Sequence, residues 1–389
     1  MAKHTTQLPA STSPALVLGH PSPAESQQIW GQTSTIWTDA LTVPQYMEEY
    51  AYMLTVPLAR EGGITQWILV DSEAADDPNE SAGGQGRRRT VLASCETFRK
   101  RALVSNTVND SVEECIVHGI ASVFCAPELR RQGYASRLLK ELGRILPSWQ
   151  TSPKSRCAGS VLYSDINPEF YERLGWVPSP SLQLEFQPQD VICEARPLYA
   201  EDLEALCRRD EDILRASLRG PSSTVNGTKV KFAIIPDHAH IRWHHSKEEF
   251  GANSLFAGSR KPDVKGAIAG SEENRVWVIW AHRFYRHPGS SESSANTLYI
   301  LRLVVESSAP DARDVKAVLH AAQSEALQWG LGKVKLWSPT RELEETIEAA
   351  GVKFEKVTRE KDSIPCLNWF GEGTTRQVEW LLNEKYAWC

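Results

Sequence analysis

One stretch of the chain combines residue types that together bind phosphate groups. The apolar run that ends at Cys125 is followed by the loop 130–136, which contains arginine, glutamine and glycine, and by an amphipathic helix predicted over 131–146. This order places unpaired backbone N–H groups, the positive end of a helix dipole and two arginines at one point. Such a point suits a pyrophosphate, so we expect a bound coenzyme and therefore an enzyme.

The composition is that of an ordinary globular protein. With 389 residues, 41% of them hydrophobic and 24% charged, the chain is long enough for two domains or one large one. Its net charge of −6 gives no support for a nucleic-acid partner. No apolar run approaches the roughly 20 residues that cross a bilayer, so we expect no membrane partner either.

Cysteine usage and the N-terminal segment indicate a compartment. The first residues contain no apolar signal core, and the eight cysteines include no C-x-x-C pair. We therefore expect a cytoplasmic protein with free thiols. The sequence leaves the oligomeric state open.

Predicted elements recur in the same order in two parts of the chain. Residues 91–186 and residues 276–357 both read as a strand hairpin, a helix, a strand, a helix, a glycine and a strand. The later copy lacks the phosphate-type loop, because residues 306–314 occupy that position. We expect a mixed α/β fold with helix-flanked sheets, a first domain over 1–190 and a degenerate copy of it over 191–389.

Proline, serine and glycine mark the expected helix ends. Ser22 and Pro23 predict the start of one helix, whereas Pro168 and Gly175 bracket a short one. The segment 72–90 is acidic, then glycine-rich, then basic, and it cannot fill a core. We interpret it as a solvated insertion in a hairpin.

The loop and two later motifs together resemble the GNAT acyltransferase family. The loop reads R-R-Q-G-Y-A over 130–135 and fits that family's Arg/Gln-x-x-Gly-x-Gly/Ala pattern. Asn167 and the run F-Y-E-R-L-G-W over 170–176 follow in the family's order. The loop alone is common by chance, whereas the set in this order is specific. The resemblance implies a central mixed β-sheet flanked by helices, and transfer of an acetyl group from acetyl-CoA to an amine.

The resemblance assigns the coenzyme to the strand end, the loop and the first helical turn. Gly133 would let the backbone approach the phosphates, and Phe124 with Cys125 would pair with the pantetheine arm as a neighbouring strand does. Tyr171 stands where the family places the acid that returns a proton to the departing thiolate. The implied coenzyme residues are Phe124, Cys125, Arg130, Arg131, Gln132, Gly133, Tyr134, Ala135, Ser136 and Asn167.

The sequence defines the general base less well. Where relatives often carry a Glu or His on the strand before the loop, this chain has Gly119 and Ala121. His118 is the neighbouring candidate, but it has the opposite strand parity and serves only if a bulge turns it inward. Glu113 and Glu114 are further candidates, and the absence of any side-chain base stays open.

A resemblance to one group within this family extends over most of the chain. The runs 160–167, 241–250 and 380–389, together with the loop, resemble the fungal lysine N6-acetyltransferase group, in which a GNAT domain precedes a family-specific C-terminal half. This resemblance implies that free L-lysine is acetylated on its side-chain amine, an opening step of lysine catabolism. The second half would then complete the acceptor pocket.

The acceptor amine rests on that resemblance alone. Arg242, Arg283 and Arg302 could bind the carboxylate of an amino acid, although ion pairs at the surface are the commoner role of arginine. Two other functions fit the motifs: acetylation of a polyamine or secondary-metabolite amine, and binding of acyl-CoA without catalysis. The intact loop and Tyr171 favour catalysis.

Histidines are concentrated in the second half, which raises the question of a metal. Adjacent histidines on a helix point to different faces, and no carboxylate or cysteine completes a regular ligand spacing. We therefore expect no metal site. The histidines considered are His238, His240, His244, His245, His282 and His287.

Overall fold

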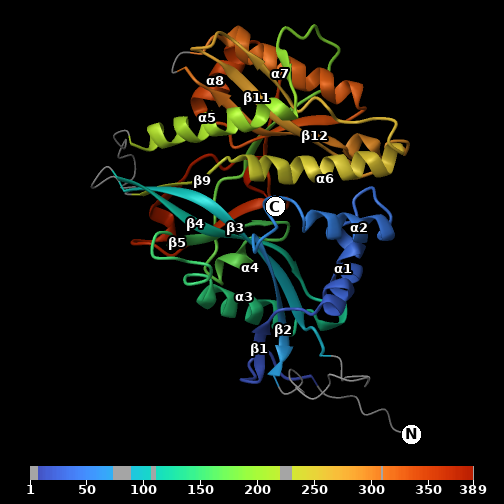
Figure 1. The fold of residues 1–389 in the computed structure, drawn as a ribbon, viewed down its shortest axis with the longest axis vertical. Coiled ribbons are helices and arrows are strands. Elements are labelled where there is room, and N and C mark those ends of the chain that lie inside the picture. Colours follow the sequence, from blue (N-terminus) through green and yellow to red (C-terminus); the bar gives the residue numbers. More distant parts are fainter. Residues whose placement is uncertain (1–7, 73–88, 107–110, 220–229, 308–309, 389) are drawn as a thin grey trace.

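The protein is built on two twisted sheets with helices between and around them (Figure 1). The computed structural model describes residues 8–72, 89–106, 111–219, 230–307 and 310–388. The expected mixed α/β class is confirmed. Most of the insertion expected at 72–90 lies outside the described residues.

The first sheet leads into the phosphate-type loop and orders its main strands β1-β2-β3-β4-β5-β15-β6. β4 and β5 are parallel, whereas the other neighbours in this row are antiparallel. The later part of β3 pairs with β9, which also pairs with β16. The strands are β1 Leu16–Gly19, β2 Ile64–Asp71, β3 Ala93–Asn106, β4 Ser111–Phe124, β5 Cys157–Ser164, β6 Val177–Pro178, β9 Val230–Ile234, β15 Ile364–Trp369 and β16 Val378–Trp380.

The second sheet repeats this plan. Its order is β14-β7-β13-β12-β11-β10-β8, and its one parallel pair, β12 with β13, is joined through a helix as β4 and β5 are. The repeated order that the sequence predicts is therefore present. The strands are β7 Leu182–Phe186, β8 Arg196–Leu198, β10 Gly266–Ala269, β11 Val276–Arg283, β12 Thr297–Val305, β13 Lys333–Trp337 and β14 Glu355–Thr358.

Helices cover both sheets, and α6 runs between them (Figure 1). α3 packs its apolar side on the first sheet, and α7 does the same on the second. Within the described ranges, no helix is long and apolar enough to cross a membrane. The helices are α1 Pro23–Trp37, α2 Val43–Met53, α3 Tyr134–Ile145, α4 Glu169–Glu172, α5 Ala200–Leu218, α6 His238–Phe256, α7 Ala312–Gln328 and α8 Arg341–Ala349.

Each sheet contains a strand from the other part of the chain. β15 lies between β5 and β6, with Cys366 opposite Leu162, and β7 lies between β13 and β14, with Leu184 opposite Leu336. The two strands occupy the same place in the two rows. The sheets thus do not divide at residue 190, and the two domains expected from the sequence stay a prediction.

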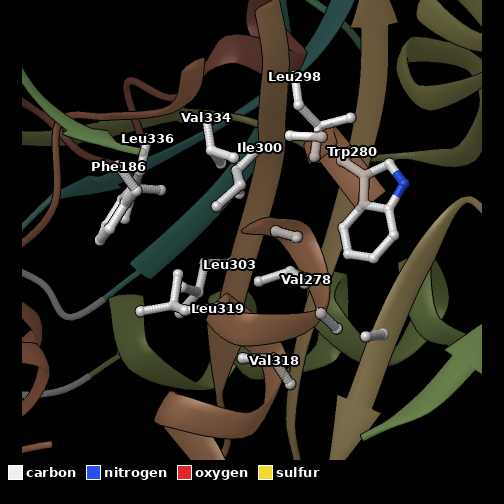
Figure 2. Close-up of a cluster of buried hydrophobic side chains, with 14 of the residues drawn as sticks. Phe186, Val278, Trp280, Leu298, Ile300, Leu303, Val318, Leu319, Val334 and Leu336 are labelled. Atoms are coloured by element: carbon white, nitrogen blue, oxygen red, sulfur yellow. The ribbon is translucent and has the colours of Figure 1, made fainter. Parts of the chain in front are cut away.

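The core of the second sheet includes this exchanged strand. Figure 2 shows Phe186 of β7 beside Leu336 of β13, in the cluster to which α7 contributes Val318 and Leu319. All four side chains are buried. Because a residue before position 190 packs in this core, the later part of the chain depends on β7 for its packing.

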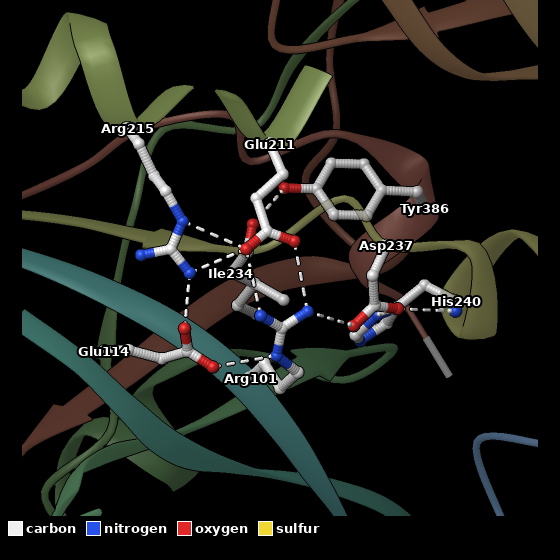
Figure 3. Close-up of polar contacts among 8 residues, drawn as sticks. All are labelled: Arg101, Glu114, Glu211, Arg215, Ile234, Asp237, His240 and Tyr386. Atoms are coloured by element: carbon white, nitrogen blue, oxygen red, sulfur yellow. Dashed lines mark hydrogen bonds and ion pairs between the residues drawn. The ribbon is translucent and has the colours of Figure 1, made fainter. Parts of the chain in front are cut away.

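Polar contacts join the first sheet to the helices above it (Figure 3). Arg101 of β3 pairs with Glu114 of β4 and with Glu211 of α5, both at 2.9 Å, and Arg215 of α5 contacts both glutamates. The hydroxyl of Tyr386, near the end of the chain, donates to the Ile234 carbonyl at 2.6 Å. The C-terminal segment is therefore fixed beside β9 and α6.

Candidate active site

The phosphate-type loop begins where β4 ends and leads directly into α3. Arg131 and Gly133 have φ values of 63° and 87°, which turn the chain into the helix. α3 begins after Gly133 without a side-chain cap, and within the described residues no acceptor binds the backbone N–H groups of 131–136. These amides and the exposed segment 130–132 form a cradle that fits a pyrophosphate.

The segment before β1 forms one wall of this cradle. Arg137 donates to the carbonyls of Ser11 and Ser13 at 3.1 and 3.0 Å, and the Tyr134 hydroxyl donates to a carbonyl of the same segment at 2.8 Å. A Cβ added to Gly133 would lie 2.6 Å from the Ser11 hydroxyl oxygen. Glycine is therefore needed at this position for its φ and for this contact.

β4 and β5 separate at the end that faces the loop. Their parallel pairing ends at Ile120 opposite Leu162, although β4 continues to Phe124 and β5 to Ser164. Ser122 has a φ of 52°, and the pairing of β4 with β3 shifts register next to it, so a bulge bends β4 here. The edge of β4 beyond Ile120 is thus open to an extended ligand that lies as an added strand.

Tyr171 lies on α4, beside this open strand end. Its side chain is 8% exposed and belongs to the buried cluster that contains Ile120 and Phe124. Burial, and after it the charge of Asp165, raises the pKa of Tyr171 above the usual value. The phenol therefore stays protonated at neutral pH and can donate a proton.

The other predicted coenzyme residues make local contacts that shape the site. Arg130 Nε donates to the Cys125 carbonyl at 3.0 Å, and Gln132 Nε2 donates at 3.1 Å to the carbonyl four residues earlier. Asn167 Oδ1 accepts a 3.0 Å hydrogen bond from the Glu169 amide, at the start of α4. Ala135 and Ser136 form the first turn of α3. Contacts of these residues with a coenzyme stay a prediction.

His118 lies four residues before the bulge, where β4 pairs in regular register with β3 and its register with β5 has just shifted, between Ile116 and Val117. It is opposite Arg99 of β3 and Ser160 of β5, and its Nε2 is 3.1 Å from the Trp149 carbonyl, just after α3. Burial lowers the pKa of His118 to about 4. The catalytic role of His118 stays a prediction.

The two further base candidates are engaged at the other end of β4. Glu113 pairs with Arg156, and Glu114 pairs with Arg101, both at 2.9 Å. Glu114 precedes Ser122 by eight residues, a long distance along a strand. Neither glutamate is near the open strand end.

A buried carboxylate that sequence reasoning missed lies beside the bulge. Glu96 of β3 is 7% exposed and accepts hydrogen bonds from the Tyr50 hydroxyl of α2 and from Gln66 Nε2, the latter at 3.1 Å. Burial raises the pKa of Glu96, while hydrogen bonds from Tyr50, Gln66 and Ser122 partly offset that rise. Such a carboxylate can take a proton from a group at the open strand end. Its signal in the sequence is a single acidic residue in the apolar run 91–98.

A cavity elsewhere in the structure is lined by both parts of the chain. Glu49 of α2 pairs with Lys247 of α6, and Asp39, after α1, pairs with Arg283 of β11, both at 2.5 Å. The next residue of α2 after Glu49 is the tyrosine that contacts Glu96. The cavity and the surroundings of Glu96 therefore share α2, although Glu96 itself does not line the cavity.

The three arginines considered for a substrate carboxylate have different surroundings. Arg302 is buried between Asp210, at 2.8 Å, and Glu384. Arg242 pairs with a glutamate of its own helix at 3.3 Å. Of the three, Arg283 lines the cavity.

The histidines of the second part bind groups within the fold. His245 Nε2 lies 2.9 Å from the Trp280 carbonyl, and His244 Nε2 lies 3.2 Å from the Tyr386 carbonyl. Among the described residues, no three His, Cys, Asp or Glu side chains are arranged to hold a metal ion.

Comparison with known proteins identifies the class. Residues 180–389 match the model of a family described as the LYC1 GNAT-like C-terminal domain. A protein named lysine acetyltransferase from Yarrowia lipolytica is 23% identical over 352 residues, which are 77% of this chain and 85% of that protein.

Two solved structures are similar over most of the chain. A GCN5-related N-acetyltransferase from Kribbella flavida covers 90% of this chain and 70% of its own, with 14% identity and a TM-score of 0.48. Another, from Anabaena variabilis, covers 90% and 72%, with 13% identity and a TM-score of 0.49.

The loop, the separated parallel strands and the family match define a GNAT-type acetyltransferase. The chain belongs to the family with a LYC1 GNAT-like C-terminal domain, since the match covers more than half of its residues.

Proposed function

We propose that the protein transfers the acetyl group of acetyl-CoA to the side-chain amine of free L-lysine, with both substrates bound together. The observation that carries this proposal is the placement of Tyr171 and Glu96 beside the same open end of β4. The name of the Yarrowia lipolytica relative, lysine acetyltransferase, supports the choice of acceptor.

Acetyl-CoA supplies an activated acyl group as a thioester. The amides of 131–136 bind its pyrophosphate, and the free edge of β4 after Ile120 holds the pantetheine arm. Because α3 and the loop occupy one side of the first sheet, the amine approaches from the other side, where Glu96 and α2 lie.

The reaction needs one proton acceptor and one proton donor. A lysine ammonium has a pKa near 10.4, so freeing the amine at pH 7 costs about 4–5 kcal/mol unless the site helps. Glu96 takes that proton, directly or through water, and the amine forms the C–N bond as the C–S bond breaks. Tyr171 then donates its proton to the departing thiolate, and the second proton that the nitrogen loses as the amide forms restores the phenol.

The second part of the chain completes the acceptor pocket in this proposal. It repeats the sheet of the first part but has no glycine loop at the corresponding place, where α7 begins after a capping aspartate, Asp311. It is therefore not expected to bind a coenzyme of its own. We also propose a cytoplasmic location, which the free thiols of the seven described cysteines support.

The test is an acceptor panel. The protein is incubated with acetyl-CoA and L-lysine, polyamines or unrelated amines, and release of free thiol is followed; mass spectrometry of the product locates the acetyl group. We expect L-lysine to react fastest and to carry the group on its side-chain nitrogen. Turnover of unrelated amines without turnover of lysine would reject the proposal.

A further inference from the structure

Two buried cations contact one aromatic ring, and one of the two lines the cavity. Arg359, which follows β14, is 4% exposed, and its guanidinium carbon lies 3.6 Å from the centre of the Trp337 ring. Lys385 is 5% exposed and lines the cavity, and its Nζ lies 4.4 Å from the same ring and 3.6 Å from that of Trp388. Both cations belong to the family-specific part of the chain.

Neither cation forms an ion pair in the described part of the chain, although the carboxylate of Asp362 acts on both from a greater distance. Arg359 Nε donates to the Ser181 carbonyl at 3.2 Å, while its two terminal nitrogens are buried without any hydrogen-bond partner. The contacts of Lys385 Nζ are with the faces of aromatic rings. The neighbouring Arg283, in contrast, is already paired with Asp39.

Such an arrangement is costly unless a ligand completes it. A buried charge without a partner destabilises a fold by several kcal/mol, so proteins rarely keep one without use. Burial lowers the pKa of Arg359 to about 10 and that of Lys385 well below its usual value, and the charge of Asp362 offsets only part of this effect. An entering anion would stabilise the charged form of both side chains.

The chemistry of the free groups indicates a carboxylate. With Nε already bound, Arg359 presents its two terminal nitrogens as a fork, which matches the two oxygens of a carboxylate. Trp337, Trp388 and Tyr299 form apolar walls that exclude water and strengthen that interaction.

These cations lie close to the site of acetyl transfer. Tyr163 of β5 packs against Trp337, with ring centres 6.1 Å apart. Two residues later, the charge of Asp165 acts on both Lys385 and Tyr171. Lys100 of β3 donates to a carbonyl in the turn that carries Lys385, at 2.5 Å.

We infer that Arg359 and Lys385 bind the carboxylate of an amino-acid acceptor and so select an amino acid over a plain amine. This inference rests on the proposed transfer to lysine. It assigns to the second part of the chain a direct role in substrate selection.

The experiment compares L-lysine with L-lysinamide, which lacks only the anionic carboxylate. The full-length protein is measured for kcat and KM with acetyl-CoA, and for binding of each compound by calorimetry in the presence of CoA. The variants are Arg359→Gln and Lys385→Met. Arg341→Gln, which removes an exposed arginine of α8, is the matched control.

For the wild-type protein we expect kcat/KM to be higher for lysine than for lysinamide by about tenfold or more. This factor is the usual contribution of a charged hydrogen bond at a buried site. In each variant the ratio of kcat/KM for lysine to kcat/KM for lysinamide should fall close to one, mainly because KM for lysine rises. The kcat and KM for lysinamide should change less than about threefold. The control should behave as wild type. Lys385→Met should keep or raise Tm, because it removes an unpaired buried charge.

Equal use of lysine and lysinamide by the wild type would overturn the inference. Equal loss of both activities in the variants, with Tm lowered, would overturn it as well. If lysine binds more tightly than lysinamide but is not acetylated, the proposed function fails and the inference stands. If lysine is acetylated without any preference, the inference alone fails.

Discussion

Glu96 is a carboxylate within a sheet, and its surroundings suit a proton acceptor. A glutamate that lies against apolar strands is stable there only with donors, and Tyr50, Gln66 and Ser122 supply them. Glu96→Gln keeps the shape and removes the proton-accepting charge. We expect kcat at neutral pH to fall by about 10²-fold, the lower range for general base catalysis, with acetyl-CoA affinity unchanged.

The measurement for Glu96 is the pH dependence of kcat. Because burial raises its pKa, the acidic limb of the wild-type profile should lie above pH 4.5, and it should disappear in Glu96→Gln. Glu113→Gln, which removes an exposed carboxylate of β4, is the control. An unchanged kcat and profile in Glu96→Gln would show that Glu96 is not the base.

Tyr171 is the proposed proton donor, and its test is the removal of one hydroxyl. Tyr171→Phe fills the same buried space, so we expect Tm and the Kd of acetyl-CoA to change little. Turnover should fall by about 10²-fold, because the thiolate then leaves without a proton. Tyr52→Phe, at a half-exposed position of α2, is the control. Wild-type turnover in Tyr171→Phe would contradict the assignment.

The lowered pKa of His118 predicts that the free energy of unfolding, and not the activity, depends on the protonation of this residue. Burial lowers its pKa from 6.5 to about 4, so the unfolded chain binds a proton more readily than the native state. Its contribution to stability is therefore present above pH 6.5 and is lost as pH falls toward 4. The full effect is about 3 kcal/mol.

The measurement for His118 is denaturant unfolding at pH 7 and pH 4.5. His118→Gln should lose less stability between these two pH values than the wild type does, whatever its stability at pH 7. Identical losses in both proteins would show that His118 is protonated equally in the folded and unfolded states.

At the scale of the element, local signals identified helix ends well. Ser22 and Pro23 predicted the start of α1, and the structure shows a capping box in which the Ser22 hydroxyl accepts from the Glu25 amide. Gly175, the predicted stop, has a φ of 105°. Both signals depend on residues within one helical turn, which is why the sequence contains them.

The residues next to a strand or a buried polar group do not indicate which distant segment it contacts, so these contacts could not be predicted from the sequence. Cys366 pairs with Leu162, some two hundred residues earlier, and nothing near either residue indicates the other. Glu96 was missed for the same reason, because its donors come from α2, β2 and β4. The glycine loop was found because its chemistry lies within one contiguous segment.

Gly133 joins the loop to α3, and its replacement tests the coenzyme cradle. Any side chain there meets Ser11 and adopts an unfavourable φ, and a glutamate adds repulsion toward phosphates. We expect Gly133→Glu to abolish acetyl-CoA binding measured by calorimetry. Gly31→Ala, in open space on α1, should leave binding intact and raise stability by roughly 0.5–1 kcal/mol. Unaltered affinity in Gly133→Glu would reject the loop assignment.

At the scale of the molecule, the exchange of β7 and β15 couples the two sheets. A fragment of residues 1–190 would retain the loop and Tyr171 but would lose β15, which pairs with β5 along six residues, and β9, which pairs with β3. Its sheet would then expose the backbone edge of β5 and the apolar side chains of that region. The remainder, 191–389, would lack β7, the strand between β13 and β14.

We therefore expect neither fragment to fold alone. Circular dichroism and calorimetry should show one cooperative transition for the full chain and none for either fragment, because each lacks a strand that only the other supplies. Mixing the unfolded fragments and removing denaturant should restore the transition and acetyl-CoA binding, since both strands are then present. A cooperative transition and coenzyme binding by 1–190 alone would show that the first sheet is independent. In that case the later part of the chain would serve the acceptor and not the fold.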